Sequence, residues 1–125
     1  MIAVDTSIMV AILRKEPGYE RYLWAIAEAD AAYISSVNLL ESYLVLGNRF
    51  NEVDALVNDI GISVRDFTSS TCYIARNAFL KYGKGRHKAA LNICDCAAYA
   101  TAKESNLPLL YKGDDFSLTD IAPVP

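Results

Sequence analysis

The fold class is indicated by the first seven residues of the chain, MIAVDTS at positions 1–7. An apolar run of strand length ends at the carboxylate of Asp5, and residues 6–14 continue with apolar side chains at helical spacing. A strand followed directly by a helix is the basic unit of an α/β protein. Because parallel α/β sheets bind ligands where their strands end, Asp5 lies at a position suited to chemistry.

The same alternation continues along the chain. We expect further strands at residues 32–35, 62–64 and 109–111, an edge strand at 121–124, and helices at 19–30, 37–45, 51–60, 68–79 and 91–105. Asn51 is a candidate N-cap and Gly61 a helix stop. The pattern predicts one α/β domain over residues 1–125, with a parallel sheet flanked by helices on both faces.

Composition limits the classes of protein that the chain can represent. It has 125 residues, 53% of them apolar, which is enough for a core that needs neither disulfides nor a structural metal. No apolar run approaches the length of a membrane span, and no basic leader is present, so we expect a cytoplasmic protein without membrane contact. The net charge of −3 means that a nucleic acid would need a local basic patch or a cation.

Nitrogen and sulfur ligands are scarce. The chain has three cysteines and a single histidine, His87. Cys94 and Cys96 point to nearly opposite sides of a predicted helix, so small core residues are the favoured interpretation. Any catalytic or metal-binding role in this chain must therefore be carried by carboxylates.

Two acids are in unusual positions. Asp5 is either the N-cap of the following helix or a functional group at the strand end. Glu41 lies among Val37, Leu44 and Val45, within a predicted apolar stripe where a carboxylate is costly unless a cation or donors satisfy it.

Further acids follow later in the chain. Asp95 shares a helical register with apolar residues, which suggests a functional carboxylate. The alternative is a structural role at the helix start, in a capping box with Asn92 as the N-cap. Asp114 and Asp115 follow the predicted strand at 109–111, in a segment that also suits an ordinary turn.

Taken together, these acids predict a metal site. Those at strand ends and those on helices packed against the sheet converge at one carboxyl edge. Converging carboxylates cannot all ionise without a counter-charge, and hard oxygen ligands favour Mg²⁺ or Mn²⁺. Such ions bridge phosphate oxygens and activate water, so hydrolysis of phosphodiester bonds suits this set best.

Three stretches around these acids resemble a known family. They are IAVDTS at residues 2–7, ALNICDCAAYA at 90–100 and PLLYKGDDF at 108–116, with the Glu41 helix between the first two. In this order they are similar to PIN-domain ribonucleases of the VapC toxin type, over essentially the whole chain. The resemblance implies a single PIN-like domain and a Mg²⁺-dependent endoribonuclease that a VapB-like antitoxin holds inactive. It further implies that the metal is held by Asp5, Glu41, Asp95 and an acid after the last main strand, where we favour Asp114 over Asp115.

The resemblance also suggests supporting residues. Thr6 and Ser7 match the hydroxyl residues after the first aspartate of the family, and helix capping explains them equally well. Lys84, Arg86 and Lys88 form the only dense basic cluster, which either contacts RNA phosphates or is a solvated loop.

The expected partners are an RNA substrate, an antitoxin whose Arg or Lys enters the carboxylate pocket, and a second copy in a homodimer. Aromatic residues such as Trp24 and Tyr43 serve either an interface or the core.

Three alternatives remain. A response-regulator receiver has similar length, with Asp66 and Lys112 after strands, but places adjacent acids after its first strand. A haloacid-dehalogenase phosphatase needs an aspartate where Ser7 stands. A PIN-like module that binds RNA or protein without cutting it is the third.

Overall fold

The four strands form one parallel sheet in the order β3-β2-β1-β4, and the computed structural model describes all residues 1–125. The strands are β1 (Ile2–Val4), β2 (Ala32–Ser35), β3 (Ile62–Arg65) and β4 (Leu109–Leu110). The helices are α1 (Thr6–Leu13), α2 (Tyr19–Glu28), α3 (Ser36–Leu46), α4 (Phe50–Ile60), α5 (Ser69–Tyr82) and α6 (Ile93–Glu104), with a 3₁₀ turn at Phe116–Leu118. The predicted α/β class is confirmed.

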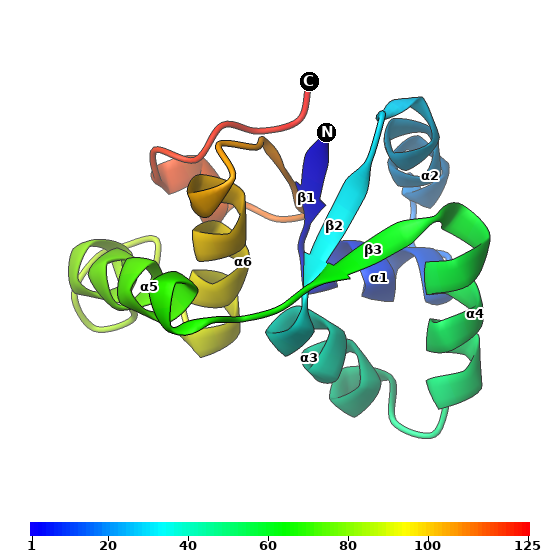
Figure 1. Cartoon of the computed structure of the whole chain (residues 1–125), viewed down its shortest axis with the longest axis horizontal. Coiled ribbons are helices and arrows are strands. Elements are labelled where there is room, and N and C mark those ends of the chain that lie inside the picture. Colours follow the sequence, from blue (N-terminus) through cyan, green and yellow to red (C-terminus); the bar gives the residue numbers. More distant parts are fainter.

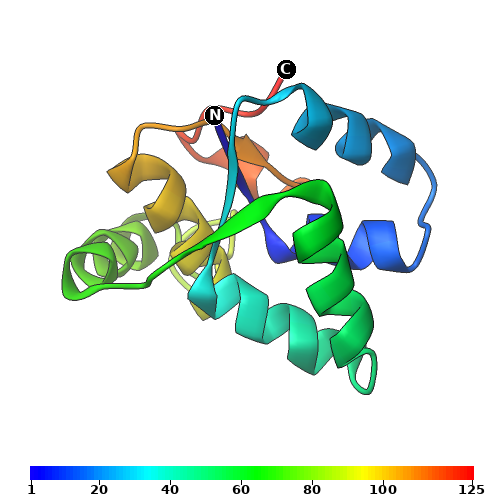
Figure 2. The ribbon, with the colours of Figure 1, turned by 45° about the vertical axis from the view of Figure 1, so that its right-hand side comes forward.

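Helices cover both faces of the sheet, as predicted. Figure 1 shows α5 and α6 on one side and α1, α2 and α4 on the other. Each side has its own buried apolar cluster, one including Tyr82 and Leu109 and the other including Ile8, Ile34 and Val53. Helix α3 lies across the carboxyl ends of the strands, at the end of the molecule away from both chain termini (Figures 1 and 2).

Two local predictions are wrong. Helix α4 begins at Phe50 with Arg49 as its N-cap, so Asn51 lies inside the first turn, although Gly61 does end the helix in a left-handed conformation. Residues 121–124 form no regular strand and make only one bridge to β4, between Leu109 and Pro123. Proline has no N–H to donate, so a ladder cannot continue through this segment.

Helix α3 buries a different face from the one predicted. Its buried residues are Asn38, Ser42 and Leu46, whereas Leu44 of the predicted apolar stripe is 69% exposed and Leu40, one turn earlier, is 56% exposed. The helix follows β2 without a loop, and Ser35 caps it by accepting a hydrogen bond from the Val37 N–H. The strand end therefore fixes the direction of α3, and its polar row meets α1 and α6.

None of the helices combines the length and the apolar character needed to cross a bilayer.

Candidate active site

Three of the predicted acids face one pocket at the carboxyl edge of the sheet. Asp5 follows β1, Glu41 is in α3 and Asp95 is in the first turn of α6, and all three line a cavity of about 300 Å³. Residues separated by up to 90 positions thus meet because parallel strands end at the same edge. Thr6, Ser7, Glu16 and Lys112 also line this carboxylate pocket.

Asp5 is both a helix cap and a member of the pocket. One carboxylate oxygen accepts a hydrogen bond from the Ser7 N–H at 3.0 Å, and the Asp5 N–H donates to the carbonyl of Leu110 at the end of β4. The side chain is buried, and this burial raises its pKa to about 6, with the Asp95 and Glu41 charges acting in the same direction. The two interpretations of Asp5 are therefore compatible.

Asp95 likewise has two roles open to it. It forms a capping box with Asn92, in which Asp95 Oδ2 accepts from the Asn92 N–H at 3.0 Å and Asn92 Oδ1 accepts from the Asp95 N–H at 2.9 Å. The box engages only one carboxylate oxygen, so the other remains for a ligand. Burial raises the pKa of Asp95, and the charges of Asp115 and Glu41 add to the effect.

Glu41 is half-buried, at the edge of the buried row of α3. The thiol of Cys94 lies beside Glu41 but does not line the pocket, and it is only partly buried, whereas the sequence suggests a core residue. Burial raises the pKa of Cys94 to about 12, and the charge of Glu41 and a hydrogen bond to it contribute further. Cys94 therefore remains a neutral thiol beside the carboxylates.

The two candidates for the fourth acid differ in their electrostatic effect. Both are exposed, and neither lines the pocket. The charge of Asp115 raises the pKa of Asp95, whereas the charge of Asp114 contributes to the shift of neither Asp5 nor Asp95. The family resemblance favours Asp114, whereas the effect on Asp95 favours Asp115.

The hydroxyl residues after Asp5 have separate partners. Ser7 hydrogen-bonds to Asp5, and its hydroxyl oxygen accepts from the Lys112 N–H at 3.0 Å, which joins the start of α1 to the turn after β4. Thr6 instead donates its hydroxyl to the carbonyl of Asn38 at 3.3 Å.

The basic residues of the predicted cluster lie outside the carboxylate pocket. Lys84, Arg86 and Lys88 are exposed on the loop between α5 and α6, and none of them lines the carboxylate pocket. The cation at the pocket is Lys112, whose ammonium contacts Glu16 at 2.7 Å. Sequence reasoning missed this role for Lys112, although its position directly after a strand was a usable signal.

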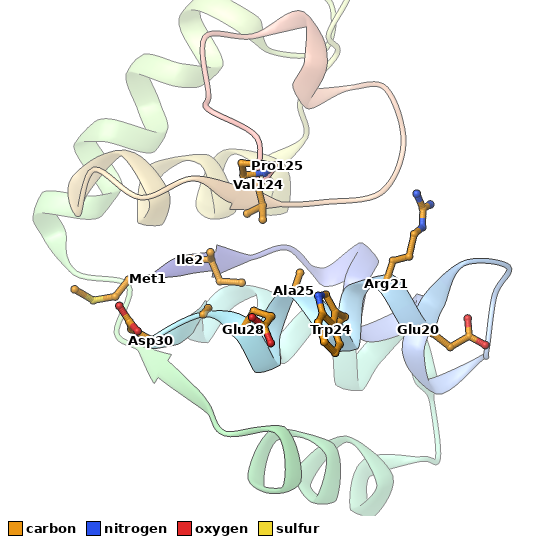
Figure 3. Close-up of a pocket in the computed structure, with 11 residues that line it drawn as sticks. Met1, Ile2, Glu20, Arg21, Trp24, Ala25, Glu28, Asp30, Val124 and Pro125 are labelled. Carbon is orange, nitrogen blue, oxygen red and sulfur yellow. The ribbon is translucent and has the colours of Figure 1, made fainter.

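The largest cavity lies at the other end of the sheet. It measures about 690 Å³ and is formed by α2, the start of β1 and the end of the chain, including Ile2, Trp24 and Val124 (Figure 3). The Trp24 side chain is 68% exposed, so it is not a core residue. Glu20 and Glu28 line this cavity as well.

The carboxylate pocket fits a divalent cation in charge and in ligand type. No three His, Cys, Asp or Glu side chains come together as a complete metal-binding cluster. The pocket nevertheless collects hard oxygen ligands, and burial, with a smaller contribution from neighbouring negative charges, raises the pKa values of Asp5 and Asp95. A bound cation would stabilise the ionised form of these groups, and oxygen ligands of this kind suit Mg²⁺ or Mn²⁺.

Comparison with known proteins agrees with this arrangement. The PIN domain family model matches residues 2–122. A "Ribonuclease VapC" of Mycolicibacterium smegmatis is 39% identical over 98% of this chain and 99% of its own length. Among solved structures, VapC20 of Mycobacterium tuberculosis, described as a toxin that cleaves the sarcin-ricin loop, superposes with a TM-score of 0.75 at 18% identity, covering 99% of this chain and 98% of its own. A toxin-antitoxin complex from Klebsiella pneumoniae gives 0.73 at 16% identity, covering 94% and 91%.

The chain therefore belongs to the PIN domain family. Within it, the chain is a ribonuclease of the VapC type, the toxin of a toxin-antitoxin system. The receiver alternative is wrong, because receivers have the strand order 2-1-3-4-5, whereas β1 here lies between β2 and β4.

Proposed function

We propose that this chain is an endoribonuclease that depends on Mg²⁺, for which Mn²⁺ can substitute, and that it hydrolyses RNA phosphodiester bonds at the carboxylate pocket. The observation that carries the proposal is the meeting of Asp5, Glu41 and Asp95 in one pocket. Asp115 is the proposed fourth acid, because its charge acts on Asp95.

Each acid would hold the ion with an oxygen that the fold leaves available. Asp5 uses one oxygen to cap α1, and Asp95 uses one in its capping box, so both carboxylates are held in fixed directions. When bound, the cation would neutralise a phosphate and activate a water molecule. Ser7 would keep Asp5 oriented, and Lys112 at the pocket rim would attract the phosphate backbone.

The path of the RNA beyond the pocket is proposed to include the loop at residues 84–88. Its three cations are exposed and lie on the segment that leads to the start of α6, where Asp95 is located. An acidic protein needs such a local patch to bind a polyanion.

We propose an antitoxin as the partner, in keeping with the toxin class. Four carboxylates, with Glu16 as the fourth, line the pocket against the single ammonium of Lys112, so the pocket stays electronegative. An Arg or Lys of the antitoxin would therefore enter it and compete with the metal. Inhibition should then weaken as the Mg²⁺ concentration rises.

A second copy of the chain is the other proposed partner. An apolar groove of about 450 Å³ between α3, α5 and α6 is lined by Val37, Phe79, Leu80 and Ile93, and the exposed row with Leu40 lies on the same helix as Val37. Exposed apolar surface of this kind marks protein interfaces. Analytical ultracentrifugation of the wild type and of Leu80→Lys tests the homodimer.

Metal dependence is the decisive experiment for the activity. Cleavage of a single-stranded RNA should require added Mg²⁺ or Mn²⁺ and should stop in EDTA. Undiminished cleavage in EDTA would refute the metal mechanism, whereas metal binding without any cleavage would favour the binding module that does not cut RNA.

A further inference from the structure

Asn38 is a fully buried polar residue at the junction of three elements. It lies in α3, one turn before Glu41, and its exposed fraction is 0%. Its side-chain nitrogen Nδ2 donates to Thr6 Oγ1 at 3.0 Å and to the carbonyl of Cys94 at 3.1 Å. Its own main-chain carbonyl accepts from the hydroxyls of Thr6 and Ser42.

These contacts involve the immediate neighbours of the pocket acids. Thr6 follows Asp5 in the chain, and Cys94 precedes Asp95. A single amide thus joins α1, α3 and α6 at the points where each presents a carboxylate to the pocket. No other side chain hydrogen-bonds both to α1 and to the start of α6.

The arrangement is costly for the fold. Asn38 Oδ1 is buried and has no hydrogen-bond partner. A buried polar atom without a partner destabilises the folded state, so packing alone does not account for an asparagine here. The three carboxylates also repel one another, and a link between the segments that bear them opposes their separation.

We propose that Asn38 is a positioning residue of the active site, which fixes the spacing of Asp5, Glu41 and Asp95 and so sets the affinity for the divalent cation. It acts through Thr6, Cys94 and the α3 backbone and does not itself touch the ion. The inference rests on the proposed metal-dependent function, because it concerns the affinity of that site. Residues behind metal ligands commonly change metal affinity by about 10- to 100-fold when they are replaced.

The experiment measures Mn²⁺ binding directly, by titration calorimetry of the whole chain in the absence of RNA. Asn38→Leu has a similar shape, adds no charge and removes both donated hydrogen bonds. Thr71→Val is the matched control, because Thr71 is also a buried and hydrogen-bonded polar residue, but it lies in α5 away from the pocket. We expect Asn38→Leu to bind Mn²⁺ at least about tenfold more weakly, and Thr71→Val to bind it as the wild type does.

A second readout separates positioning from general stability. RNA cleavage by Asn38→Leu should recover when Mn²⁺ is raised in proportion to the loss of affinity, which a simple loss of folded protein would not do. If Asn38→Leu does not fold, Thr6→Val, which breaks only the link to α1, replaces it and should show a smaller shift in the same direction. When both variants fold, their effects on Mn²⁺ affinity should be non-additive in a double-mutant cycle.

Two different results would overturn the inference, and each refutes a different part of the argument. Equal Mn²⁺ affinity in the folded Asn38→Leu variant and the wild type would refute the role of Asn38 and leave the proposed function intact. A wild type that binds no Mn²⁺ would refute the proposed function, and the positioning role with it.

Discussion

Asp5 links the stability of the metal-free protein to pH. Burial raises the pKa of this carboxyl from 3.8 to about 6, so the folded chain binds the proton more tightly than the unfolded chain. The contribution of Asp5 to stability is therefore complete below about pH 4 and is lost as the pH rises through about 6. At about 1.4 kcal/mol for each tenfold change in proton affinity, the loss amounts to about 3 kcal/mol.

The substitution Asp5→Asn tests this magnitude. Asparagine retains an oxygen that can cap α1, but it does not titrate. Between about pH 4 and pH 7, we expect the unfolding free energy of the wild type to fall by about 3 kcal/mol relative to that of the variant. Urea unfolding in EDTA, followed by circular dichroism, measures this difference, and Asp59→Asn on the exposed surface of α4 is the control. Parallel pH profiles for the wild type and Asp5→Asn would refute the reasoning.

Three further predictions concern the site. Glu41→Gln and Asp95→Asn should abolish detectable cleavage and leave the metal-free Tm unchanged or raised, because charge repulsion is relieved; a large fall in Tm with cleavage intact would assign both acids to structural roles. Asp115→Asn should weaken Mn²⁺ binding by about tenfold and Asp114→Asn much less, and the reverse order would identify Asp114 as the fourth acid. Alanine at the three cations of residues 84–88 should lower the salt slope of RNA binding by about two units, measured by fluorescence anisotropy with uncleaved RNA; an unchanged slope would place the RNA elsewhere.

Most of the fold was predictable because the local signals agree with one another. Alternating apolar runs and helix stops such as Gly61 placed nearly every element, and the position of Asp5 at a strand end placed the pocket. The buried face of α3 was not predictable from the periodicity of its apolar residues. Its apolar row looks like a core stripe, yet the polar row with Asn38 is the buried one, because β2 fixes the direction of the helix.

The site was predictable to the extent that it depends on strand ends. Glu41 was selected for the wrong reason, since its apolar neighbours in sequence are exposed and its carboxylate reaches the pocket from the edge of the buried face. The contacts of Lys112 with Glu16 and of Asn38 with Thr6 join residues distant in sequence. No periodic pattern encodes such pairs, so only the folded chain shows them.

The placement of Trp24 has an optical consequence. It is the only indole in the chain, it is 68% exposed, and it lies at the amino end of the sheet, opposite the carboxylate pocket. An indole this exposed is largely hydrated in the folded state already, so we expect its emission to change little when the chain unfolds or when the pocket takes up a cation. Covering of the outer face of α2 by another protein would remove water from this ring and shift its emission to shorter wavelengths. The unlabelled protein thus contains a fluorophore that distinguishes docking on α2 from events at the carboxylate pocket.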